Sequence, residues 1–147
     1  MSAADAALHH LFEANRLLRE AGERIASAAG QTHARRMVLQ AAADGATVPD
    51  IARRLGLHRQ GVQRIADELV ADGLGRYDEN PRHRLSKLFV VTDRGTAALS
   101  TISRAHGTWV DAIEAEAADI DWSALRNDLA LLVRVLQDQA QRTTPPQ

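Results

Sequence analysis

The chain has 147 residues, a length that fits one domain or two small lobes sharing a core. It has no cysteine, which excludes a disulfide scaffold, a thiolate nucleophile and a cysteine zinc site. The formal net charge is -1, so a nucleic-acid-binding surface would need its basic residues sorted onto one face. No apolar run reaches the ~18–20 residues of a transmembrane helix, and no signal-peptide pattern opens the chain. We therefore expect a cytoplasmic protein with no membrane partner.

The first predicted element is a long helix over residues 3–29. Its apolar positions alternate in steps of four and three, which is the spacing of a seam that faces a partner helix. The seam consists of Ala4, Leu8, Leu11, Asn15, Leu18, Gly22, Ile25 and Ala29. Two interpretations stay open: a contact between subunits, in which Asn15 sets the register, or a surface helix packed on its own domain.

Three more helices are predicted next. Residues 32–43 form the first, and turn residues at 44–45 end it. Thr47 is a candidate N-cap for a short helix that Gly56 ends. Residues 58–72 form a longer amphipathic helix with arginine and glutamine on its polar face. Two helices joined by a tight glycine-containing turn, the second amphipathic, are typical of a helix-turn-helix.

The pattern then changes to that of a β-hairpin. Residues 75–77 are a short strand candidate, residues 85–92 are rich in strand-forming side chains, and a polar loop at 78–84 joins the two. Two long helices follow, over residues 94–118 and 122–141, before a tail at 143–147. The last helix carries an apolar stripe at Leu125, Leu129, Leu132, Val133 and Leu136.

This order of elements resembles the MarR family of bacterial transcriptional regulators over about residues 35–99. The most specific matches are IARRLGL at 51–57, HRQGVQRIADEL at 58–69, DGL at 72–74, and NPRHRLSKLFVVTDRG at 80–95. The resemblance implies a mainly α fold with a small β-hairpin wing. It assigns residues 32–92 to a winged helix-turn-helix DNA-binding region, and residues 1–31 and 93–147 to helices that form a dimer.

The candidate DNA-binding residues lie on the 58–72 helix and at the hairpin tip. Arginine can contact guanine bidentately and glutamine can do so with adenine, so the polar face of this helix suits base recognition. The alternative is an ordinary solvated helix surface, which the hairpin that follows makes less attractive. The predicted DNA-binding residues are Arg59, Gln60, Gln63 and Arg64 on the helix, and Arg82, His83 and Arg84 at the tip.

The hairpin tip departs from the family pattern. Many members carry an acidic residue, any residue and an arginine there, and the aligned positions in this chain are His83 and Leu85. Because neighbouring residues of a strand point to opposite faces, we expect Arg82 and Arg84 to share one side and to contact DNA. The same alternation predicts that Leu85 turns towards the protein and anchors the base of the wing.

Other kinds of site find little support. The six histidines are scattered, without a helical pair at metal-ligand spacing, so we predict no metal and no cofactor. No nucleophile–base pair or phosphate-binding loop is evident, so we do not expect an enzyme. Large or polarizable groups at Phe12, Met37, His106 and Trp109 are candidate walls of an effector pocket, although core packing explains the same residues.

The leading hypothesis is a homodimeric repressor that binds a pseudo-palindromic operator in double-stranded DNA and is released by a small aromatic or lipophilic effector. An alternative is a winged-helix protein–protein adaptor without specific DNA binding, which the unusual wing and the acidic stretch at 111–128 favour. A constitutive architectural DNA-binding protein is a third interpretation.

Overall fold

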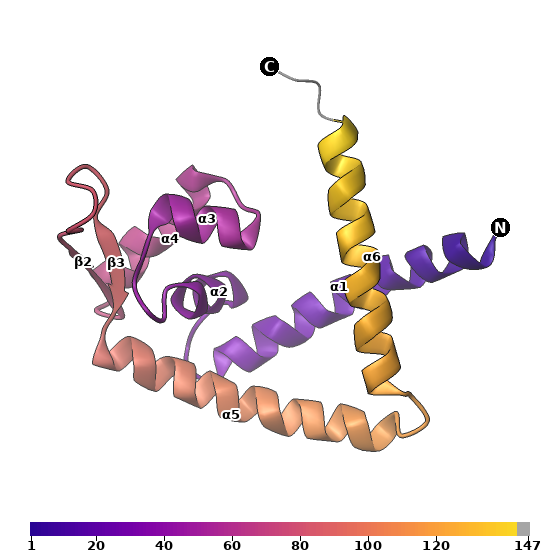
Figure 1. Ribbon diagram of the computed structural model, residues 1–147. Helices are drawn as coiled ribbons and strands as arrows, with labels where there is room; N and C mark the ends of the chain where they lie inside the picture. The colour runs from indigo at the N-terminus through magenta and orange to yellow at the C-terminus, as the bar shows by residue number, and fades with distance from the viewer. Residues whose placement is uncertain (144–147) are drawn as a thin grey trace. The chain divides into compact units, whose positions relative to one another are not determined.

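A computed structural model describes residues 1–143 of the chain. The chain divides into two compact units, the first over Met1–Thr108 and the second from Trp109 onward. Figure 1 shows the helices and strands along the chain. The predicted fold class is confirmed: the protein is mainly helical, with a small antiparallel sheet.

Helix α1 (Ala3–Ser27) has two different halves. Its C-terminal half buries Ala21, Ile25 and Ala26, whereas apolar residues in its N-terminal half, such as Leu8 and Phe12, are exposed. Gly22 allows the close approach to helix α2 (His33–Ala41), because a β-carbon at this position would lie 2.5 Å from Nδ1 of His33. The exposed half of α1 is the part that keeps an unpartnered apolar seam in the single chain.

Helices α3 (Val48–Leu55) and α4 (Arg59–Ala71) form the predicted helix-turn-helix. Thr47 caps α3, since its hydroxyl accepts a hydrogen bond from the backbone N–H of Asp50. Gly56 ends α3 in the left-handed conformation, with φ of 63°, which favours glycine. The hydrophobic core lies between α2, α3, α4 and the sheet. Its fully buried large side chains include Val38, Leu39, Ile51, Val62, Leu69 and Phe89.

The wing belongs to a three-stranded antiparallel sheet rather than to a two-stranded hairpin. Strands β2 (Gly75–Asp78) and β3 (Leu88–Val91) pair as predicted, and β1 (Ala46–Thr47) adds to the other edge of β3. Two residues are too few to show an alternating pattern, which is why the sequence did not reveal β1. Glycine at position 75 leaves room for the ring of Phe89, which would lie 2.3 Å from a β-carbon there.

Helix α5 (Asp93–Glu116) begins where the sheet ends. The hydroxyl of Thr92 accepts from the backbone N–H of Gly95 and donates to the carbonyl of Gly73. A β-carbon on Gly95 would lie 2.2 Å from the carbonyl oxygen of Leu74, so only glycine allows α5 to start so close to the chain before β2. These contacts fix the first turn of α5 against the segment that joins α4 to β2.

Helix α6 (Trp122–Thr143) belongs to the second unit and buries none of its residues. The predicted apolar stripe is present, and Leu125, Leu129, Val133 and Leu136 on it are exposed. Of the predicted tail at 143–147, Thr143 is the last residue of α6 and the others lie outside the described residues. Within residues 1–143, every helix is too short or too polar to span a bilayer.

Candidate nucleic-acid interface

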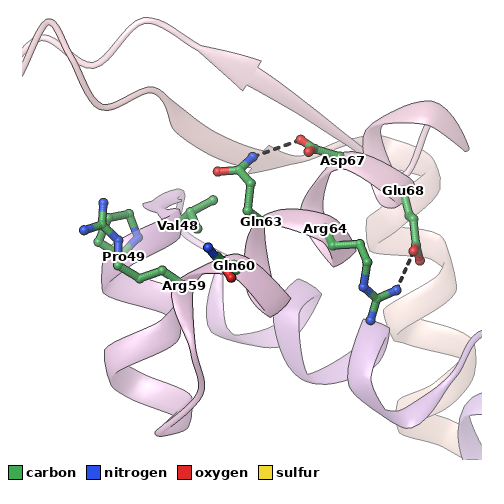
Figure 2. Close-up of a pocket in the computed structure, with 8 residues that line it drawn as sticks. All are labelled: Val48, Pro49, Arg59, Gln60, Gln63, Arg64, Asp67 and Glu68. Carbon is green, nitrogen blue, oxygen red and sulfur yellow. Dashed lines mark hydrogen bonds and ion pairs between the residues drawn. The ribbon is translucent and has the colours of Figure 1, made fainter.

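Helix α4 separates a buried face from a polar one. Val62, Ile65 and Leu69 are buried in the core, whereas the four predicted base-reading residues are all exposed. These four line one surface hollow together with Val48 and Pro49 from the start of α3, as Figure 2 shows. The structure therefore brings Arg59, Gln60, Gln63 and Arg64 together on one accessible surface.

Gln63 is held by two neighbours, which the sequence did not predict. Its Nε2 lies 2.9 Å from Oδ1 of Asp67 and 2.9 Å from the hydroxyl of Tyr77, and donates to both. The Tyr77 hydroxyl donates in turn to the same Asp67 oxygen, over 2.6 Å. Asp67 lies one helical turn along α4, but Tyr77 comes from β2, so only the folded structure makes this triangle visible.

The other three base-reading candidates differ in their partners. Arg64 forms an ion pair with Glu68 at 2.6 Å, one turn along the same helix. Arg59 and Gln60 have no hydrogen-bond or ion-pair partner among residues 1–143, so their donors are available to a ligand. His58, which precedes Arg59, is the N-cap residue of α4 without a side-chain cap bond. The N-terminal end of α4 is thus the part of this surface whose polar side chains have the fewest partners among residues 1–143.

The Tyr77 phenol stays protonated over the physiological range. Its burial and its hydrogen bond to Asp67 both raise the pKa of Tyr77 well above the ordinary value of 10.0. The ring packs edge-on against Phe89, with 6.0 Å between the ring centroids. Tyr77 therefore joins the core to the polar surface of α4 and keeps its proton available for Asp67.

The tip of the wing consists of turns rather than extended strand. The backbone N–H of Arg82 donates to the Asn80 side chain, and that of Ser86 donates to the carbonyl of His83. Arg82, His83 and Arg84 are exposed there, as predicted. The expectation for Leu85 is wrong: the residue is 91% exposed, because strand alternation does not extend to a residue that lies in a turn before β3.

The base of the wing adds residues that the sequence analysis missed. A second hollow is lined by Arg59 and Gln63 of α4, Tyr77 of β2, and Leu85, Ser86 and Lys87 at the wing, with Val48 and Pro49. Lys87, the only lysine of the chain, therefore lies beside the exposed polar face of α4. Its place directly before a strand was the only signal in the sequence.

The candidate effector-pocket residues have different environments. Phe12 on α1 is 78% exposed, whereas Met37 on α2 and His106 on α5 are half-buried. Trp109, also half-buried, is the first residue of the second unit. The pocket stays a prediction.

Comparison with known proteins identifies this architecture. The model of the MarR family matches residues 37–84, which run from α2 to the wing. An uncharacterised protein of Mycobacterium bovis is 40% identical over 127 residues, covering 83% of this chain and 89% of that protein. A crystal structure of a MarR family transcription regulator is 25% identical, with a TM-score of 0.79 and coverage of 95% of this chain and 99% of that one. The chain belongs to the MarR family.

Members of this family are winged-helix transcriptional regulators that bind DNA, and this MarR-family protein is such a regulator and not an enzyme. A Mycobacterium tuberculosis transcriptional regulator crystallised in complex with DNA is also similar. It is 25% identical with a TM-score of 0.69, and the match covers 90% of this chain and 96% of that one. Between the two leading hypotheses, these matches support the DNA-binding regulator over the protein–protein adaptor.

Proposed function

We propose that this regulator is a homodimeric repressor that binds a pseudo-palindromic operator through α4 and the wing. The observation that carries the proposal is the shared exposure of Arg59, Gln60, Gln63 and Arg64 on one face of α4. A recognition helix of a helix-turn-helix places such a face in the major groove. The exposed wing residues Arg82, His83 and Arg84 supply contacts to phosphate or to the minor groove.

The dimer in this proposal uses residues 1–31 and 93–147. Its support is the apolar surface that the single chain leaves exposed, on the N-terminal half of α1 and along α6. Exposed apolar side chains on a helix face are typical of an interaction site. A two-fold dimer presents two recognition helices about 34–36 Å apart, one turn of DNA, which matches a palindromic site.

The release of the repressor belongs to the same proposal. A small aromatic or lipophilic effector lowers DNA affinity only if it binds the DNA-incompetent conformation more tightly. Phe12, Met37, His106 and Trp109 are the proposed walls of its pocket. Titration of salicylate-like phenols against Trp109 fluorescence tests this, with a Trp109→Phe variant that retains only Trp122 as the control. No saturable change and no loss of DNA binding would remove the effector from the proposal.

The experiment that tests DNA recognition is a gel-shift titration against the DNA that flanks the gene of this protein. Specific binding gives a shift that persists in excess random competitor. Its affinity falls steeply with salt, by a log–log slope of about -0.9 for each phosphate neutralised. Binding that competitor abolishes would indicate the architectural interpretation, and no binding at all would overturn the proposal.

A further inference from the structure

We infer that Asp67 and Tyr77 fix the Gln63 amide so that it reads DNA as a hydrogen-bond acceptor, selecting amino bases over keto bases. This inference rests on the proposed function, because it needs α4 to lie in the major groove. It adds a specificity: adenine or cytosine, which offer an amino hydrogen there, over guanine or thymine, which offer oxygen at the same place.

The geometry of the triangle sets the direction of the amide. Nε2 of Gln63 is within 2.9 Å of both the Asp67 carboxylate and the Tyr77 hydroxyl. These two oxygens lie 2.6 Å apart, and both accept a hydrogen bond from the Gln63 amide. In Figure 2 the amide nitrogen of Gln63 faces Asp67 and its oxygen points away.

The charge of Asp67 prevents the amide from turning over. An ionised carboxylate only accepts hydrogen bonds, so a turned amide would place Oε1 against a carboxylate oxygen and leave Nε2 without these partners. Tyr77 strengthens the constraint from a second element, and its packing on Phe89 holds the hydroxyl in place. A free glutamine can present either its oxygen or its nitrogen to a base, whereas this one presents its oxygen.

Arg64 provides an internal comparison on the same helix. Glu68 holds Arg64 one turn along, as Asp67 holds Gln63. A guanidinium has donors only, so the partner of Arg64 affects its position but not the kind of base group it seeks. The inference therefore concerns Gln63 alone, and Glu68 offers a matched control.

The test is selection from randomised operators by the full-length protein, followed by affinity measurements on the selected sites. Gln63→Ala identifies the operator position that Gln63 reads. At that position the parent should bind adenine or cytosine about 2- to 12-fold more tightly than guanine or thymine, the range expected for one hydrogen bond. Asp67→Asn frees the amide to turn, and this ratio should fall below about 2-fold. The Asp67→Asn/Tyr77→Phe double variant should show the same loss.

Glu68→Gln is the control, because it removes the same charge from the neighbouring position without touching Gln63. It should raise overall DNA affinity as Asp67→Asn does, but keep the preference for amino bases. Thermal unfolding monitored by circular dichroism shows whether each variant is folded. If the double variant does not fold, the result for Asp67→Asn alone decides the inference.

Three results would overturn the inference while leaving the repressor proposal intact. The position read by Gln63 selects guanine or thymine, Gln63→Ala changes no position, or Asp67→Asn keeps the parental ratio. A library from which the parent enriches no sequence would overturn the proposed function, and the inference with it.

Discussion

Asp50 is a single side chain at the start of the helix-turn-helix whose contribution to folding stability depends on pH. Its carboxylate accepts from the Thr47 hydroxyl at 2.9 Å and pairs with Arg53 at 2.7 Å. The hydrogen bond from Thr47 is the main cause that lowers the pKa of Asp50 below 3.8, and Arg53 lowers it further. A depressed carboxyl pKa contributes stability above the unfolded-state value and loses it as the pH falls through the folded-state value.

We therefore predict that Asp50→Asn is less stable than the parent at pH 7, and that the difference shrinks below about pH 4. Urea unfolding midpoints at pH 7 and pH 3 measure it. Asp44→Asn, in the exposed turn before β1, is the control for removing a carboxylate. A difference between parent and Asp50→Asn that is the same at both pH values would contradict the prediction.

The wing is the element whose role depends most on its departures from the family pattern. Arg84 is exposed at a turn, and the Asn80 and His83 backbone groups shape that turn. We predict that Arg84→Ala weakens operator binding. If Arg84 contacts phosphate, the loss is uniform across operator variants and the salt slope falls by about 0.9. If it enters a narrow minor groove, the loss is confined to A·T-rich flanks.

Fluorescence anisotropy over a salt series, on operators with A·T-rich and G·C-rich flanks, measures this effect. Leu85→Ala is the neighbouring control, since Leu85 is exposed and carries no charge. Parental binding by Arg84→Ala, together with weaker binding by a stably folded Leu85→Ala, would reverse the roles of the two residues.

The elements that the sequence predicted well are those with regular apolar spacing over several turns or with residues that mark their ends. Helix α3 was recognisable because Thr47 and Gly56 mark its two ends chemically, and both act as expected. Strand β1 was missed because two residues carry no period, and Leu85 was misplaced because the extended strand begins later than its composition suggested. The hydrogen bond between Gln63 and Tyr77 links residues that lie 14 positions apart on different elements. No local sequence pattern predicts such a contact.

At the scale of the whole molecule, the proposed dimer depends on apolar residues of α6 that are exposed in the single chain. Leu129 and Leu136 on α6 are exposed in the single chain, so glutamate there should cost the isolated fold little. We predict that Leu129→Glu/Leu136→Glu abolishes dimerisation and operator binding together. Each buried leucine contributes about 1.5–3 kcal/mol to an interface, so the dimer dissociation constant should rise at least 100-fold.

Sedimentation equilibrium measures the mass, and Gln137→Glu, on an exposed position of the same helix, is the charge control. The prediction fails if the double variant keeps the dimer mass. A dimer that persists while DNA binding is lost would place α6 outside the interface and leave α1 and α5 as the remaining candidates.

The two carboxylates on the polar face of α4 also have a consequence for how the regulator searches a genome. Asp67 and Glu68 lie beside Gln63 and Arg64, so this face is not uniformly positive. Binding to random DNA depends almost entirely on neutralising phosphates, and a face of mixed sign gains less from it than a purely basic one. Since a genome offers about 10⁶–10⁹ competing sites, weak attachment to random sequence leaves more of the regulator free to find its operator. Selectivity in a cell is the ratio of operator binding to random binding, so under the proposed function these carboxylates favour the operator to the extent that they weaken random binding more than operator binding.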